Sequence, residues 1–69
     1  MLVTVKNSKI GYRVTSSSGN KGTITALYSD FVYIKWDICE EPIFYMNSEL
    51  RHYNIKYIAK HSLIKRIII

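Results

Sequence analysis

Residues 21–36 decide the fold class, because they read KGTITALY, then SD, then FVYIKW. β-branched and aromatic residues fill both arms, and the Ser-Asp pair between them suits a tight hairpin turn. The second arm alternates with a period of two, which places Val32, Ile34 and Trp36 on one face. We expect this face to be buried, because the opposite face carries Lys35. The stretch therefore predicts a β-hairpin with one core-facing side.

Short strand-like runs flank this hairpin on both sides, with turn residues between them. No apolar stripe of helical spacing and useful length occurs, so the whole chain is predicted to be all-β. The exception is one capped helical turn over Asn47–Arg51, with Asn47 or Ser48 as its cap. The remaining strands are predicted over Lys9–Thr15, Ile43–Tyr45, His52–Ile58 and Leu63–Ile69, with a turn at Lys60-His61-Ser62 before the last.

The chain has 69 residues, which predicts a single domain spanning residues 1–69. Cys39 is the only cysteine, so a disulfide within the chain and a zinc site built from several cysteines are excluded. No apolar run is long enough to span a membrane, and the N-terminal residues lack the pattern of a signal peptide. We expect a cytoplasmic protein that has no membrane partner.

Basic residues outnumber acidic ones by ten to five, which gives a formal net charge of +5. A balance this basic on so small a body favours a polyanionic partner, either nucleic acid or an acidic protein surface. Simple solubility explains the same charge and stays open. Isoleucine, lysine, asparagine and tyrosine supply 28 residues, which is typical of an AT-rich gene from a phage or an AT-rich bacterium. For a phage gene, the host cytoplasm is the expected location.

A pattern of glycines and strand ends runs from Lys9 to Asp37. It consists of Gly11-Tyr12-Arg13-Val14, Gly19, Gly22-Thr23-Ile24 and Val32-Tyr33-Ile34-Lys35-Trp36-Asp37. This pattern resembles the N-terminal half of small SH3-like barrels of the KOW and Tudor kind. Leu63–Ile67 is similar to the short turn and closing strand of such barrels. The segment Ile38–Ala59 departs from the pattern, as an added hairpin or a helical turn beside the barrel.

The resemblance implies an SH3-like barrel of about five strands with one short helical turn. It also implies a binding role, because KOW-type barrels bind RNA, ribosomes or transcription machinery, and Tudor-type barrels bind methylated side chains. Many phage proteins use the same barrel to contact host proteins. The glycines and Trp36 have a purely structural reading as well, since a barrel needs close backbone approach and a large apolar side chain.

Catalytic and metal-binding chemistry finds little support in the sequence. His52, His61 and Cys39 are the candidate nucleophile, base and metal ligands, but no family signature surrounds them and their spacing matches no common metal site. A phosphate-cradling glycine loop is absent as well. We expect a protein that is not an enzyme and has no cofactor.

Two sets of residues are predicted to bind a partner, because rings stack on bases while cations follow phosphates. The first set is Arg13, Lys21, Phe31, Tyr33 and Lys35, and the second is Arg51, Lys56, Lys60 and Arg66, with neighbours His52, Tyr53, Tyr57 and Lys65. Solvated strand faces with tyrosines packed on lysine stems are the alternative for both. A Tudor-like cage from Tyr12, Tyr28, Phe31 and Tyr33 is the less favoured reading, since it requires convergence of the rings.

The C-terminal Ile67-Ile68-Ile69 leaves at least one isoleucine facing outward in a strand. A free edge there would be a hazard, so we expect either the barrel, a partner or a second copy to cover it. Strand addition is one mode of such cover, and a homo-oligomer is therefore one expectation. The leading functional prediction is a non-enzymatic binding module for nucleic acid or a nucleic-acid-processing machine. The alternative is a small protein-binding factor that inhibits or redirects a host protein.

Overall fold

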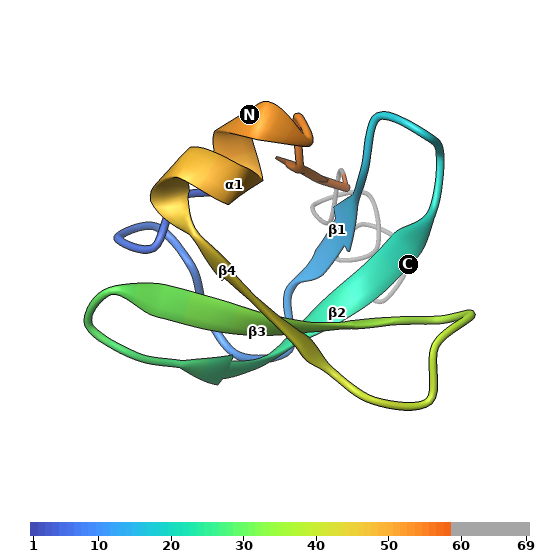
Figure 1. Cartoon of the computed structure of the whole chain (residues 1–69), viewed down its shortest axis with the longest axis horizontal. Helices are drawn as coiled ribbons and strands as arrows, with labels where there is room; N and C mark the ends of the chain where they lie inside the picture. The colour runs from blue at the N-terminus through green and yellow to red at the C-terminus, as the bar shows by residue number, and fades with distance from the viewer. Residues whose placement is uncertain (59–69) are drawn as a thin grey trace, which may run out of the picture.

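The computed structural model describes residues 1–58 and contains one antiparallel sheet (Figure 1). Its elements are β1 (Arg13–Thr15), β2 (Lys21–Leu27), β3 (Phe31–Trp36), β4 (Ile43–Met46), α1 (Asn47–His52) and β5 (Lys56–Tyr57). The five strands lie in the order β4-β3-β2-β1-β5. The prediction of a small all-β domain of about five strands with one short helical turn is confirmed. Among these described residues, no helix is long and apolar enough to cross a membrane.

The predicted hairpin is confirmed as β2 and β3. The Tyr28 backbone N–H donates to the Phe31 carbonyl at 2.9 Å and closes the turn. Ile24 lies opposite Ile34, but the next aligned pair is Ala26 with Tyr33, so the register shifts by one residue between Ile24 and Ala26. This β-bulge leaves one extra residue on β2 and changes which side of the sheet the following residues occupy.

The inner face of the sheet forms most of the core. Val32 and Ile34 are fully buried and Trp36 is 6% exposed, which confirms the predicted core face of β3. In Figure 1 the chain runs from β4 directly into α1, with the N-terminus beside that helix. The sheet also contributes Val14 and Ile24. The N-terminal segment adds Val3 and Val5, the helix adds Leu50, and Ile55 comes from the segment between α1 and β5.

Gly22 of β2 lies opposite Trp36 of β3, where there is no room for a side chain. A Cβ built there would lie 2.8 Å from the Lys35 carbonyl oxygen and 2.8 Å from Trp36 Cε3. Real Cβ atoms do not approach backbone oxygen so closely, so any side chain at this position would push the strands apart. The glycine therefore sets the packing of Trp36 against the sheet.

Two predicted strands are too long. Lys9–Tyr12 forms a turn, in which the Tyr12 N–H donates to the Lys9 carbonyl at 3.2 Å, and the regular strand β1 spans Arg13–Thr15. The turn is still tied to β2, because the Gly11 N–H donates to the Ile24 carbonyl at 2.8 Å and the Ile24 N–H donates to the Tyr12 carbonyl at 3.0 Å. At the other end, the predicted strand over His52–Ile58 was wrong for its first residues. Asn54 has a φ of 54°, a left-handed conformation that ends a helix, so β5 begins only after it.

The cap of α1 also differs from the prediction. The N-cap residue is Met46, rather than Asn47 or Ser48. The Glu49 carboxylate accepts a hydrogen bond from the Met46 N–H at 2.9 Å, and the Asn47 side chain accepts one from the Val5 N–H at 2.8 Å. Asn47 is used to tie the N-terminal segment to the helix, so it is not free to cap it.

The segment that departs from the barrel pattern contributes β4, α1 and β5. The strand that pairs with β1 on its far side is β5, with Val14 opposite Tyr57 and Thr15 opposite Lys56. The predicted turn at Lys60-His61-Ser62 and the predicted strand over Leu63–Ile69, with its proposed role in self-association, lie outside the described residues.

Candidate binding surface

The outer face of the sheet is the side opposite the core. Along β3 it carries Phe31, Tyr33 and Lys35, which are half-buried and alternate with the three core residues. Directly opposed residues in an antiparallel sheet share a face. The outer face therefore also contains Phe44 and Met46 of β4, Ala26 and Thr23 of β2, and Arg13 of β1, because they lie opposite one another across the ladders.

Four aromatic rings gather at one end of this face, which we call the aromatic end: Tyr28, Phe31, Tyr33 and Phe44. Tyr28 stacks on Phe31 with ring centroids 4.8 Å apart, and Phe31 meets Phe44 edge to face at 5.6 Å. Tyr33 lies 5.9 Å from Tyr28 and 6.1 Å from Phe44. Tyr28 is 52% exposed and Phe44 49% exposed, so the group presents ring surface to water.

Three cations gather at the other end, which we call the basic end: Arg13, Lys21 and Lys35, around Asp37. The Arg13 guanidinium binds the Asp37 carboxylate through two hydrogen bonds of 2.8 and 2.7 Å, and it donates to Thr23 Oγ1 at 2.8 Å. The hydrogen bond from Arg13 lowers the pKa of Asp37, and the charges of Lys35 and Lys21 lower it further. The same pair raises the pKa of Arg13. One carboxylate set against three cations leaves this end net positive.

The second predicted set does not form one cluster. Lys56 lies opposite Thr15, which in turn lies opposite Lys21, so Lys56 extends the basic end. Arg51 belongs to α1 and lines a separate cavity of about 300 Å³ with Leu2 and Thr4. Lys60, Lys65 and Arg66 lie outside the described residues.

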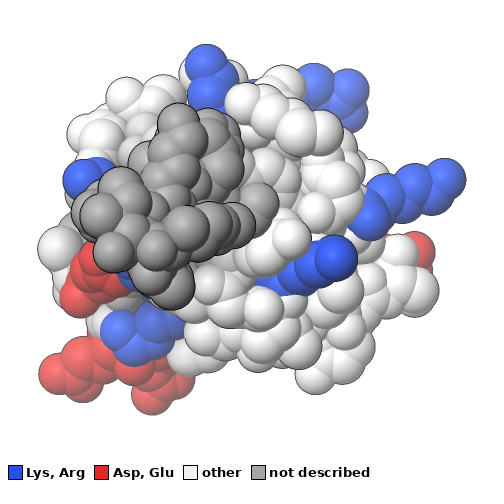
Figure 2. All heavy atoms as spheres, turned by 180° about the vertical axis from the view of Figure 1, so that it is seen from behind, with Lys and Arg blue, Asp and Glu red and all other residues white. Residues whose placement is uncertain are grey.

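The charge of the molecule is spread rather than concentrated on the face seen in Figure 2. Lys and Arg side chains stand at several separate places there, acidic side chains gather mainly at the lower left with another at the right edge, and uncharged side chains occupy much of the described surface between them. Three of the ten basic residues fall beyond residue 58. Net charge alone therefore does not locate a binding site, and the exposed rings are as important as the cations in defining one.

The structure brings the whole first predicted set onto one face, since Arg13, Lys21, Phe31, Tyr33 and Lys35 all lie on it. Sequence reasoning missed Phe44, whose place opposite Tyr33 depends on the pairing of β4 with β3. Of the four rings considered for a Tudor-like cage, Tyr28, Phe31 and Tyr33 contact one another, whereas Tyr12 packs against Tyr57 at 5.5 Å. Whether these rings hold a cation stays a prediction.

Of the three residues weighed for catalysis, Cys39 and His52 lie among the described residues 1–58, and His61 lies outside them. Cys39 is half-buried against the core, and the ring of His52 packs on Tyr53 at 4.9 Å. Within the same range, no three His, Cys, Asp or Glu side chains are grouped to hold a metal ion. The absence of enzymatic activity stays a prediction.

Comparison with known proteins gives no family for this chain. No protein-family model, curated protein or solved structure matches this chain. The function therefore has to be argued from the outer face itself.

Proposed function

We propose that the chain is a non-enzymatic binding module that takes single-stranded nucleic acid on the outer face of its sheet. The observation that carries the proposal is the contiguity of the four-ring aromatic end with the basic end on one surface. Rings offer stacking surfaces for unpaired bases, and lysine and arginine follow the phosphates between them. Both ends are built on strands, so their spacing is held by the backbone ladders.

The aromatic end supports single strands over duplex. Tyr28 and Phe44 expose about half of their surface, at 52% and 49%. A base stacks on such a ring only when it is unpaired and unstacked from its neighbours. Contiguous apolar surface of this kind marks an interaction site more often than scattered single residues do.

The basic end supports a polyanionic ligand. Lys21 and Lys56 are exposed, and Lys35 lies between the rings and Asp37. The Lys35 ammonium donates to the Trp36 carbonyl at 3.2 Å, which holds its long side chain along the sheet. A strand whose bases rest on Tyr33 would bring a phosphate toward this ammonium.

We also assign the sheet to the SH3-like barrels as a proposal. The order β4-β3-β2-β1-β5, with a short helix between β4 and β5, supports the assignment. A small phage protein acting in the host cytoplasm is the corresponding proposal for its origin. The amino-acid composition supports that origin, as described above.

The test is a fluorescence-anisotropy titration of the full chain with labelled strands of about eight nucleotides, a length within the site sizes of small barrels. Single-stranded RNA, single-stranded DNA and duplex DNA are compared at about 50 and 200 mM salt. We expect single strands to bind more tightly than duplex, with affinity that falls as salt rises. Equal binding of duplex would contradict the role of the rings, and no binding at low salt would refute the proposal.

A second candidate is a protein partner, and Met46 favours it. This side chain lies opposite Phe31 at the aromatic end and is 49% exposed. Flexible methionine beside aromatic rings is common at protein interfaces. In an affinity pull-down from lysate, one stoichiometric protein that survives nuclease treatment would support this candidate, and protein captured only without nuclease would support nucleic acid.

A further inference from the structure

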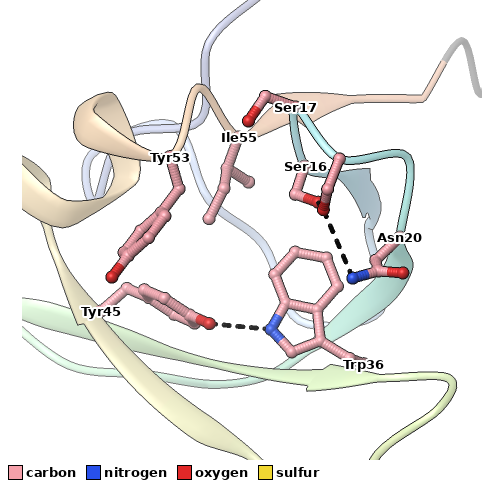
Figure 3. A pocket seen from close by; sticks show the side chains of 8 residues that line it. Ser16, Ser17, Asn20, Trp36, Tyr45, Tyr53 and Ile55 are labelled. Atoms are coloured by element: carbon pink, nitrogen blue, oxygen red, sulfur yellow. Dashed lines mark hydrogen bonds between the residues drawn. The ribbon is translucent and has the colours of Figure 1, made fainter.

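A cavity of about 260 Å³ lies at the end of the sheet next to the β1–β2 loop, apart from the aromatic end (Figure 3). Three rings from three different segments form one side of it: Trp36 at the end of β3, Tyr45 in β4 and Tyr53 just after α1. Pockets for drug-sized ligands are typically ~300 to 1,000 Å³, so this one suits a single small ring system.

The rings stand nearly perpendicular to one another. Trp36 and Tyr45 are 6.2 Å apart at 85°, and Tyr45 and Tyr53 are 6.0 Å apart at 80°. The Trp36 Nε1–H donates to Tyr45 Oη at 2.8 Å, which fixes both rings (Figure 3). Tyr53 is 48% exposed, so it offers ring surface at the opening.

The other side of the cavity is the serine-rich loop. Ser16 Oγ and Ser18 Oγ are 2.9 Å apart, and Asn20 Nδ2 donates to Ser18 Oγ at 3.4 Å. The Ser17 N–H donates to the Tyr53 carbonyl at 3.2 Å, which ties the loop to the segment after α1. Hydroxyl and amide groups are thus held facing the rings.

Among residues 1–58, no charged side chain lines the cavity. A cationic ligand would find no carboxylate, and a phosphate would find no cation. Aromatic walls beside small neutral donors and acceptors match a flat, neutral ring with polar edges. A nucleobase has this chemistry, since its faces stack and its edges form hydrogen bonds.

The cavity lies at the same end of the sheet as the basic end but on the inner side, because Trp36 faces inward while its neighbour Lys35 faces outward. Asn20 directly precedes Lys21, and Trp36 lies between Lys35 and Asp37 in the sequence. The Asp37 N–H donates to the Lys21 carbonyl at 2.8 Å, which closes the two segments together. Resting on the proposed function, we infer that one unstacked base of the bound single strand turns round the end of the sheet into this cavity, while the phosphates next to it lie along Lys21 and Lys35 on the outer face.

Trp36 makes the inference testable, because it is the only tryptophan of the chain. Its fluorescence reports the cavity, whereas the anisotropy of a labelled strand reports binding anywhere on the protein. The probes are labelled oligothymidylate of about eight nucleotides and an abasic strand with the same phosphates and no bases. We expect oligothymidylate to change the Trp36 emission with the same midpoint as the anisotropy, and the abasic strand to leave the emission unchanged.

Tyr53→Ala removes a half-exposed ring and is compared with Tyr53→Phe, which keeps it. Loss of one base–ring stack is worth roughly 1–3 kcal/mol, so Tyr53→Ala should weaken oligothymidylate binding about five- to 150-fold. Tyr53→Phe should bind like the native chain. Asn20→Ala is a second variant, which leaves every ring in place and should reduce the emission change.

The outcomes separate the two proposals. Binding by anisotropy without any change in Trp36 emission, or with native affinity in Tyr53→Ala, would overturn the cavity inference and leave the proposed function standing. An emission change equal for the abasic strand would overturn it too. No anisotropy change with any strand at low salt would refute the proposed function. If the Trp36 emission is also unchanged in that experiment, the cavity inference is refuted as well.

Discussion

The two faces of β3 carry similar residues in opposite roles. On the inner face Val32, Ile34 and Trp36 are packed against the core, whereas on the outer face Phe31 and Tyr33 pack mainly on other exposed rings. Burial explains the inner residues fully, since apolar surface leaves water there. It does not explain why Tyr28 and Phe44 keep about half of their surface in water, at 52% and 49%. Burial therefore accounts for the side chains of the inner face, whereas the exposed rings of the outer face are the basis of the proposed binding surface.

On the inner face, Ile34→Ala should lower the free energy of unfolding most. Ile34 is fully buried, and removing it leaves a cavity, so we expect a loss of about 2–5 kcal/mol in the free energy of unfolding. Urea unfolding measures it. Phe44→Ala serves as the comparison from the outer face, with an expected loss below about 1 kcal/mol. Equal losses would show that the outer rings are structural.

Gly22→Ala strains the same strand pair and crowds the core side chain of Trp36, whose Cε3 would lie 2.8 Å from the new Cβ. The new Cβ would meet the Lys35 carbonyl oxygen at 2.8 Å, so the strands must separate. We expect a loss of about 1–3 kcal/mol in thermal or urea unfolding. Thr25→Ala, at the exposed bulge of the same strand, is the matched control and should stay within about 0.5 kcal/mol. Native stability of Gly22→Ala would mean that the approach of the strands is not tight.

On the outer face, Phe44→Ala should affect binding more than folding. Loss of one stacking ring is worth roughly 1–3 kcal/mol, or about five- to 150-fold in the dissociation constant for single strands. Phe44→Tyr keeps the ring and should retain affinity in the same anisotropy titration. If Phe44→Tyr binds as weakly as Phe44→Ala, stacking at this position is excluded.

Lys35→Ala tests how much of the binding depends on a cation rather than on the rings. Losing one phosphate contact should reduce the slope of log affinity against log salt by about 0.7 for a single strand. Lys6→Ala is the control, because it removes the same charge away from the outer face. Lys6 follows Val5 in a turn, and the Val5 N–H donates to the Asn47 side chain of α1. This variant should leave the slope unchanged. Equal slopes for both variants would indicate a diffuse charge effect.

The smallest expected effect is that of Asp37→Asn. Arg13 lowers the pKa of Asp37, so the stability from this pair is complete above the ordinary carboxyl pKa of about 3.9 and is lost as the pH falls through the lowered value. The pair is exposed, so the native chain should be only slightly more stable than Asp37→Asn at neutral pH. Unfolding curves at neutral and acid pH should show this difference shrinking in acid. At neutral pH the same variant frees Arg13 and should bind single strands more tightly, and weaker binding would place Asp37 in the contact.

The sequence was sufficient for the hairpin and its core face. The alternation of residues 31–36 determines which side chains are inside, and it needs no information from the rest of the chain. The strand ends were less predictable, because they depend on local backbone states. The left-handed conformation of Asn54 is one such state, and it separates α1 from β5.

Of the candidate site, the sequence predicted Phe31, Tyr33 and Lys35 from the same alternation. It could not supply Phe44, because cross-strand neighbours follow from the register of β3 with β4. The cap of α1 was wrong for a similar reason. Asparagine is a common cap residue, but the side-chain oxygen of Asn47 accepts a hydrogen bond from the N–H of Val5, which is distant in the sequence.

The bulge between Ile24 and Ala26 has a consequence for comparing sequences. The extra residue inverts the inside–outside phase of β2, so Tyr28 joins the rings of the outer face instead of facing the core. A homologue that lacks this residue would show the opposite polar and apolar phase at the end of the strand. An alignment of such chains should therefore place a one-residue gap at Thr25, and the deletion of a single codon there would redirect the tip of the hairpin.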